Sequence, residues 1–259
     1  MPLTFVAFVL CAALFLAMLA CYEVGRRIGL ANIARSKEGE ARGRGPVEGA
    51  IFGLSGLLLA FTFSGAASRF MDRRHLIVEE TNAIGTAYLR VDLLPGDAQP
   101  EMRRFFREYV QMRIDMFRKP NDVAAARAKL AEAVEMQGRI WSLAVSACGR
   151  AGTPTPATLL LLPALNAMID ITTTRAIATE NHPPTVIYAL LAGFCLVSAL
   201  VVGRGMAATT MRHWFYAVLF AAAMAITLYV IVDMEFPRLG LIRIDSADRA
   251  LVDLLNGMK

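Results

Sequence analysis

The residues that could perform acid–base or metal chemistry are few and lie far apart in the sequence. The three histidines are His75, His182 and His213, and none of them lies in an HExxH motif or beside a pair of cysteines. Glu79 and Glu80 are adjacent carboxylates, but neighbours on a helix point about 100° apart and cannot hold one substrate atom together. They predict a charged helix face. We therefore predict no catalytic residue, no metal site and no cofactor.

The cysteines complete the set of reactive side chains, and their spacing also argues against chemistry. Three of them lie in apolar runs and none forms a CxxC pair, so we predict buried thiols that act as small hydrophobic groups. They are Cys11, Cys21, Cys148 and Cys195. The sequence contains no GxSxG motif, phosphate-binding loop or dinucleotide fingerprint. These observations predict that the protein is not an enzyme.

The most informative spacing is a series of small residues at steps of three and four, which places them on one stripe of a helix. They are Gly49, Gly53, Gly56, Ala60, Ser64 and Ala67. In lipid, helices associate through packing, and such a stripe allows two backbones to approach closely. We therefore predict helix packing through this stripe.

A second stripe, of bulky side chains, runs beside the small one at steps of seven and four. Its members are Phe52, Leu59, Phe63 and Phe70. One interpretation is ordinary packing inside a membrane. The other is a pore that this helix lines in an oligomer, where the bulky side chains form a hydrophobic constriction that closes by losing water.

Four charged residues follow this stripe: Arg69, Asp72, Arg73 and Arg74. In the pore interpretation they form a charged vestibule at one pore mouth. In the other interpretation they pair with one another on a solvated helix.

The elements that must position these residues are helices in a lipid bilayer. Of the 259 residues 56% are hydrophobic, and the mean hydropathy of +0.48 is too high for a soluble chain of this length. A helix needs roughly 20 apolar residues to cross the hydrocarbon core. Four runs are long enough: 3–22, 50–70, 185–203 and 214–232. The sequence predicts an all-α membrane protein with four spans.

The first run has an alternative interpretation as a cleaved signal, since Met18-Leu19-Ala20-Cys21 resembles a lipoprotein cleavage site. It has no basic residue before it, however, and is long for a signal core.

The four spans divide the chain into eight segments. They are 1–22 (span 1), 23–49 (basic loop), 50–94 (span 2, continuing as a long amphipathic helix), 95–183 (helical extramembrane region), 184–203 (span 3), 204–213 (short loop), 214–232 (span 4) and 233–259 (C-terminal tail with a short helix). The long helix is predicted because no proline interrupts residues 47–94, and Pro95-Gly96-Asp97 then ends it.

The middle region, 95–183, is predicted to pack around apolar helix faces. One face of its first helix carries Met102, Phe105, Phe106, Tyr109, Met112 and Met116. In the next helix an apolar repeat predicts a packing seam. It consists of Val123, Leu130, Val134, Trp141, Val145 and Cys148. The apolar run 157–171 is short for a span, contains Pro163 and ends near Asp170, so we interpret it as a packed or re-entrant helix.

The net charge of +5 does not indicate nucleic-acid binding, because the charges form no basic patch. Residues 71–183 contain fourteen Lys and Arg against thirteen Asp and Glu. Basic residues near the membrane divide equally between its two sides, but six follow the first span and none precedes it. That asymmetry favours an external N-terminus and an external middle region.

The second span and the residues after it carry a resemblance to a known family. The stretches are GLLLAFTFS from Gly56, SRFMDRR from Ser68, VEETNAIGTAYLR from Val78, and Leu93-Leu94-Pro95. They resemble the bestrophin-like family of bacterial integral membrane proteins. The order of elements, two spans, a helical middle and two more spans, agrees with that family along most of the chain.

The resemblance implies a bestrophin-like protein of the bacterial inner membrane, more distantly similar to bestrophins, which are pentameric anion channels. It implies a homo-oligomer, a pentamer by that comparison, with an inorganic anion as its partner. An Arg-aromatic-x-acid-x-Arg pattern carries over at Arg69, Phe70, Asp72 and Arg74. The asparagine-rich segment and the acidic calcium clasp of bestrophins have no counterpart here.

Two further alternatives stay open at this point. The resemblance implies a cytoplasmic middle region, contrary to the preference drawn from charge. The second functional hypothesis is a non-conducting membrane scaffold or sensor whose middle helices bind a protein partner.

Overall fold

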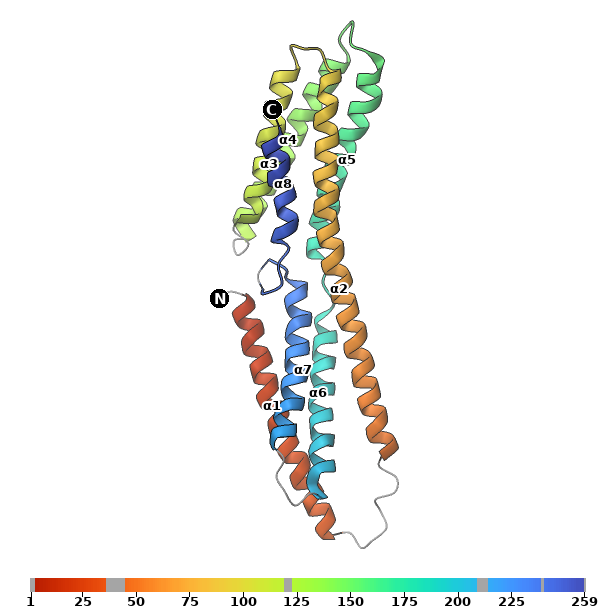
Figure 1. Cartoon of the computed structure of the whole chain (residues 1–259), viewed down its shortest axis with the longest axis vertical. Coiled ribbons are helices and arrows are strands. Elements are labelled where there is room, and N and C mark those ends of the chain that lie inside the picture. The colour runs from red at the N-terminus through yellow and green to blue at the C-terminus, as the bar shows by residue number, and fades with distance from the viewer. Residues whose placement is uncertain (1–2, 36–44, 119–122, 209–213, 239, 259) are drawn as a thin grey trace. The chain divides into compact units, whose positions relative to one another are not determined.

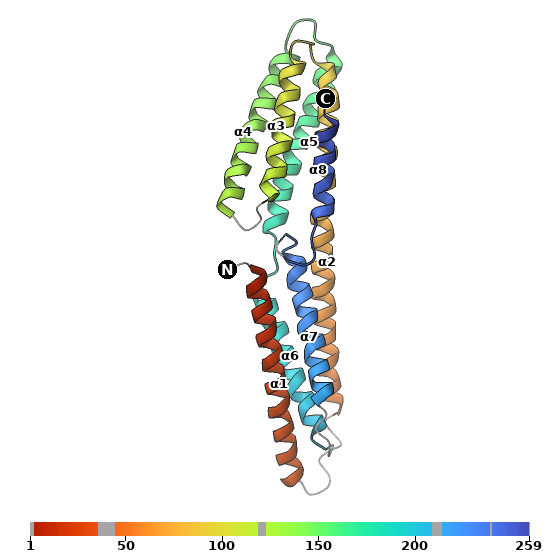
Figure 2. The ribbon, with the colours of Figure 1, turned by 60° about the vertical axis from the view of Figure 1, so that its left-hand side comes forward.

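The structure is a computed structural model that describes residues 3–35, 45–118, 123–208, 214–238 and 240–258. Over this part of the chain the regular structure is helical and contains no strand, as the sequence predicts. The helices form two units, Met1–Ser68 with His182–Phe236, and Arg69–Asn181 with Pro237–Lys259. Figures 1 and 2 show the helices from two directions.

The first unit consists of apolar helices. It contains α1 (Leu3–Arg35), the first part of α2 (Gly45–Leu89), α6 (Thr185–Gly205), the short 3-10 helix η3 (Met206–Ala208) and α7 (Trp214–Glu235). In the described residues, four helical stretches are long and apolar enough to cross a membrane: Phe5–Ala34, Gly45–Leu93, Thr155–Gly205 and Trp214–Glu235. Three of them contain one of the runs found in the sequence, and the first overlaps the run 3–22 from Phe5 onward.

Close backbone contact joins α1 and α6, which lie side by side (Figure 2). A Cβ atom built on Gly25 would lie 2.0 Å from the carbonyl oxygen of Leu200, and one built on Gly203 would lie 2.0 Å from that of Tyr22. Neither position has room for a methyl group, so glycine is what allows the two helices to cross here.

The predicted basic loop 23–49 is wrong at both ends. α1 continues to Arg35 and α2 already begins at Gly45, while residues 36–44 lie outside the described part of the chain. The extension of α1 has two physical causes. Glu23 pairs with Arg27 one turn later, with 3.2 Å between Oε1 and Nε. Gly25 and Gly29 are packed against α6 and η3, and a Cβ built on Gly29 would lie 2.4 Å from the Cβ of Ala207.

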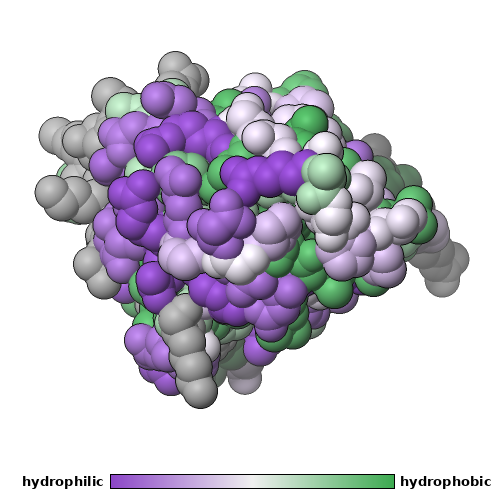
Figure 3. All heavy atoms as spheres, turned by 90° about the horizontal axis from the view of Figure 1, so that it is seen from above, coloured by the Kyte–Doolittle hydropathy of each residue, from purple (hydrophilic) through white to green (hydrophobic). Residues whose placement is uncertain are grey.

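The second unit packs the amphipathic helices around a core of large apolar side chains. It contains the rest of α2, the 3-10 helix η2 (Arg90–Leu93), α3 (Gln99–Arg118), α4 (Val123–Cys148), α5 (Thr155–Glu180) and α8 (Asp245–Gly257). Ile84, Phe106, Ile140, Leu165 and Leu251 come from five different helices and are fully buried together. The end of the molecule seen in Figure 3 is mostly hydrophilic.

α2 is a single α-helix of 45 residues, about 68 Å long at 1.5 Å per residue. It has no interruption between Gly45 and Leu89, and η2 continues it to Leu93. The first unit ends at Ser68 and the second begins at Arg69, so this helix contributes to the interiors of both.

α4 buries a different face from the one that the sequence predicted. From residue 128 on, where its side chains are described, the buried residues are Ala133, Met136, Gln137, Ile140, Ala144 and Ala147, and Val123 of the predicted seam lies outside that part. Within the predicted seam, Val134 is 54% exposed and Val145 is 44% exposed, while Trp141 and Cys148 are half-buried at the edge of the core. The correction has a structural cause: α3 and α5 pack against the neighbouring face of α4, where the alanines lie with Met136 and Ile140 at helical spacing.

α5 is packed in the second unit, in line with the packed-helix interpretation of residues 157–171. Leu161, Leu165 and Met168 are fully buried in the core. Pro163 lies inside the helix, where a proline removes the hydrogen bond to the carbonyl four residues earlier, that of Leu159. Arg90 donates to the next carbonyl, with 2.6 Å between its Nη1 and the oxygen of Leu160.

Candidate functional site

The small-residue stripe of α2 faces away from the rest of its own unit. Gly49, Gly53, Gly56, Ala60 and Ser64 are exposed. A Cβ built on any of the three glycines would meet no atom within 4 Å. The predicted close approach through this stripe is therefore not made to another described helix of this chain.

The opposite face of α2 holds the helix in its unit. Ser55 is buried, and its hydroxyl lies 3.1 Å from that of Ser198 on α6. Leu59 packs with Leu191 and Leu228, which belong to α6 and α7. α2 thus has one face directed into the unit and a stripe of small residues directed outward.

The four bulky candidates differ in their surroundings. Phe63 is 42% exposed and Phe52 is half-buried. Leu59 is 9% exposed, since it belongs to the packed interior of its unit. Phe70 packs partly against a small core that includes Ile77. Phe63 is therefore the bulky candidate most accessible to a second molecule or to a pore.

The four charged candidates also differ in their exposure and contacts. Arg69 is half-buried, whereas Asp72 and Arg74 are exposed. Arg73 is 8% exposed and donates to the last carbonyl groups of α5, with its Nε 3.1 Å from the oxygen of Ala178. Its Nη2 lies 2.9 Å from the oxygen of Asn181. Arg73 thus caps the C-terminus of α5, where helical carbonyls lack partners within the helix.

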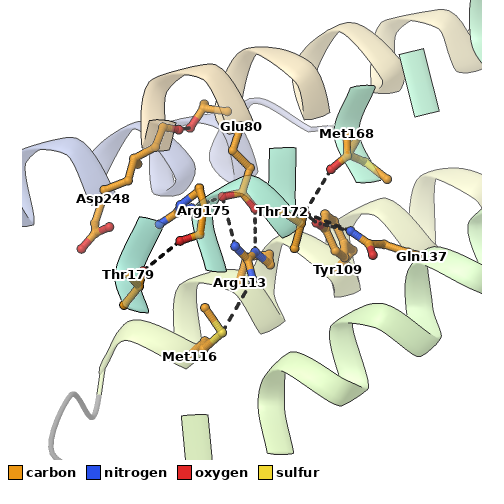
Figure 4. A network of polar contacts seen from close by, with 12 residues as sticks. Glu80, Tyr109, Arg113, Met116, Gln137, Met168, Thr172, Arg175, Thr179 and Asp248 are labelled. Atoms are coloured by element: carbon orange, nitrogen blue, oxygen red, sulfur yellow. Dashed lines mark hydrogen bonds and ion pairs between the residues drawn. The ribbon is translucent and has the colours of Figure 1, made fainter. Parts of the chain in front are cut away.

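Glu80 is the centre of a buried ion network that joins three helices (Figure 4). Its side chain is 0% exposed, and Oε1 accepts from Nε of Arg113 on α3 at 2.6 Å. Oε2 accepts from Nη2 of Arg113 at 3.2 Å and also from Nη1 of Arg175 on α5. One carboxylate thus holds two guanidinium groups, and burial lowers the pKa of Arg113 from its ordinary value.

A second buried group of polar side chains lies next to this network (Figure 4). The hydroxyl groups of Tyr109 and Thr172 are 3.0 Å apart, and Gln137 Nε2 donates to both oxygens at 3.0 Å. Thr172 also donates to the carbonyl oxygen of Met168 at 3.0 Å. These contacts connect α3, α4 and α5 and satisfy polar groups that burial would otherwise penalise.

The interpretation of Glu79 and Glu80 as a shared charged face is wrong for Glu80. Glu79 is exposed and pairs with His75, with 3.0 Å between Oε1 and Nε2. Glu80 lies three residues after Ile77 and four before Ile84, which is the spacing of the buried face. That spacing was a signal in the sequence, but nothing in it indicated that Arg113 and Arg175 would supply the partners.

Within the described residues, no group of three or more His, Cys, Asp or Glu side chains is placed to hold a metal ion. The buried carboxylate with the most extensive contacts, Glu80, is occupied by two arginines and inaccessible to a substrate. The arrangement therefore suits helix positioning rather than catalysis.

Comparison with known proteins decides the family. The model of the bestrophin-like domain matches residues 44–248, most of the chain. The chain belongs to the bestrophin-like family. Among curated proteins no sequence match is found. Family membership and the apolar helices together make this bestrophin-like chain a membrane protein, and the family fits a channel rather than an enzyme.

Solved structures share the bestrophin-like fold. A bacterial bestrophin homologue from Klebsiella pneumoniae, in a variant with a tyrosine replaced by alanine, has a TM-score of 0.69 at 12% identity. The match covers 94% of this chain and 98% of that one. A variant with a tryptophan replaced by alanine gives a TM-score of 0.68 at 14% identity, covering 93% and 97%. At such low identity the likeness establishes the fold alone.

Proposed function

We propose that this chain is a subunit of a homo-oligomeric ion channel of the bacterial inner membrane, with the outward stripe of α2 facing the pore. The observation that carries the proposal is the exposure of Gly49, Gly53, Gly56, Ala60 and Ser64 along a helix apolar enough to cross a membrane. Small residues on such a helix allow several copies to gather closely round one axis.

Phe63 is the proposed constriction. It lies beside the small stripe, one residue before Ser64, and 42% of it is exposed in the single chain. A ring of such side chains, one from each copy, forms a narrow apolar collar that water leaves readily. Phe52 extends the same lining, while Leu59 and Phe70 support it from within the subunit.

Charged side chains at the end of the apolar part of α2 would set the preference for ions. Arg69, Asp72 and Arg74 follow the apolar part of α2, and the excess of arginine favours anions at this mouth. In the proposed channel, Arg73 holds α5 against α2 instead of contacting ions, because its guanidinium is engaged by two carbonyl groups. A pentamer is the stoichiometry that the resemblance to bestrophins suggests.

The test compares two phenylalanines on opposite sides of α2. Phe61 is 67% exposed and lies two residues before Phe63, so it points about 200° away on the helix. The purified chain, Phe63→Ala and Phe61→Ala would each be reconstituted into liposomes for chloride flux measurement. Mass measurement in mild detergent would establish the number of subunits beforehand.

We expect an oligomer whose chloride leak rises in Phe63→Ala and stays at the native level in Phe61→Ala. A rise in Phe61→Ala alone would place the pore on the other side of α2. A stable monomer, or an oligomer without flux in any of the three forms, would reject the channel.

A non-conducting scaffold is the second candidate, and one surface favours it. On α4, Val134 and Val145 are exposed, and a Cβ built on Gly138 between them would meet no atom within 4 Å. An uncharged stripe of this kind suits a helix of a protein partner. An oligomer without flux would bring this candidate forward.

A further inference from the structure

Three arginines and one glutamate gather where the end of α6 meets α1, roughly two to three turns before α1 itself ends. Arg26 and Arg27 lie on α1 with Glu23, and Arg204 is the penultimate residue of α6. The two helices meet at this level, because a Cβ built on Gly25 would lie 3.1 Å from the backbone nitrogen of Arg204.

The three arginines carry more positive charge than their described acidic partner, Glu23, neutralises. Glu23 accepts from Nε of Arg27 at 3.2 Å, and its Oε2 is 4.0 Å from Nη1 of Arg26. Nε of Arg204 is inaccessible to solvent and has no hydrogen-bond partner among the described residues. A buried guanidinium donor without an acceptor costs free energy, and that cost falls when the side chain turns towards an anionic oxygen.

The surroundings place these arginines at the depth of lipid headgroups. The apolar run of α1 ends at Tyr22, after about 20 residues, which is the length that spans the hydrocarbon core. Trp214 is 36% exposed at this end, with its ring 6.0 Å from that of Tyr22, and tryptophan favours the membrane interface. On α1, Leu16 is 64% exposed within the run that ends at Tyr22, so apolar surface lies on the bilayer side of the cations.

We propose that this cluster binds the phosphate of an anionic phospholipid, with Arg204 and Arg26 as the principal donors and α1 contacting the acyl chains. Guanidinium groups suit phosphate oxygens because they present several donors in one plane. The exposed apolar side chains distinguish a lipid from a free phosphate, which has no apolar part to bury. The site lies in the first unit and does not depend on whether the protein conducts ions.

The experiment measures lipid binding to the delipidated full-length chain in detergent, by native mass spectrometry. The probes are phosphatidylglycerol, phosphatidylcholine and soluble glycerol 3-phosphate. The variants are Arg204→Gln, Arg26→Gln and Arg204→Lys. The matched control is Arg150→Gln, which removes an exposed arginine paired with Asp97 in the second unit.

We expect the native chain to retain phosphatidylglycerol in preference to phosphatidylcholine. Arg204→Gln and Arg26→Gln should each weaken that binding about fivefold. Arg204→Lys should weaken it less, because lysine keeps the charge but lacks the planar set of donors, and Arg150→Gln should stay near the native level. If Arg204→Gln does not give a monodisperse protein, Arg26→Gln carries the test. Equal retention of both lipids, or undiminished binding in the glutamine variants, would overturn the site. Complete displacement by glycerol 3-phosphate would assign it to a free phosphate instead.

Discussion

At the crossing of α1 and α6 in the first unit, Gly25 and Gly203 bring two backbones so close that a methyl group has no space. In the second unit, Phe106, Tyr109 and Ile140 fill the space between helices with large side chains. The contrast follows from the two solvents. Lipid gives no hydrophobic gain for burying apolar side chains, so helices in it depend on close contact, whereas in water the buried apolar area drives packing.

Polar contacts between helices also differ between the two units. Between α2 and α6 the first unit buries a hydroxyl pair, Ser55 with Ser198, at 3.1 Å, while its buried carboxylates, Asp233 and Glu235, lie at the end of α7. The second buries a carboxylate with two arginines and, beside it, the contacts of Tyr109, Thr172 and Gln137.

Each unit contains one of the two tryptophans, Trp214 in the first and Trp141 in the second. In a Trp214→Phe background the fluorescence of Trp141 therefore follows the unfolding of the second unit. In a Trp141→Phe background the fluorescence of Trp214 follows that of the first unit.

The largest expected effect comes from Glu80→Gln, observed through Trp141. Glutamine keeps an acceptor oxygen but not the negative charge, so Arg113 and Arg175 stay buried without the carboxylate that neutralises them, which costs about 3–5 kcal/mol of unfolding free energy. Glu79→Gln, one residue earlier, is the control. Glu79 pairs only with exposed groups among its described contacts, so its loss costs at most about 0.5 kcal/mol. Equal losses in both variants would show that the network does not hold the second unit together.

A smaller effect is expected from Gly203→Ala, observed through Trp214. The new methyl group would meet the backbone of Tyr22 at 2.0 Å, so α1 and α6 must separate, at a cost of about 1–3 kcal/mol. Gly193→Ala on the same helix meets no atom within 4 Å and should not lower the transition, since alanine is the better helix former. The comparison between the units would fail if both alanine variants unfolded at the same temperature as the native chain.

The smallest effect is expected from Ser55→Ala, again observed through Trp214. It removes the contact with Ser198, and hydrogen bonds between helices in membranes contribute about 0.6 kcal/mol on average. Ser64→Ala, at an exposed position of the same helix, is the control and should have no measurable effect. A loss in Ser55→Ala as large as that of Glu80→Gln would remove the distinction between the polar contacts of the two units.

The sequence predicted best those features that depend on local chemistry. Four apolar runs indicated the four candidate spans, because crossing lipid requires a continuous stretch of suitable side chains. The residues between Val47 and Leu94 contain no proline, and α2 indeed runs unbroken from Gly45 to Leu89. The candidate pore residues follow from spacing on this helix, and their role stays a prediction.

The tertiary structure decided which elements pack against each face of a helix. Whether Glu80 is exposed or buried depends on Arg113, 33 positions away, and on Arg175, 95 positions away. The buried face of α4 was set by where α3 and α5 pack against it, so Ile140 and several alanines are buried and Val134 is exposed. Local periodicity identifies the faces of a helix that could be buried. Which of these faces is buried depends on the helices that folding brings against it, because burial is a property of a contact and not of one residue alone.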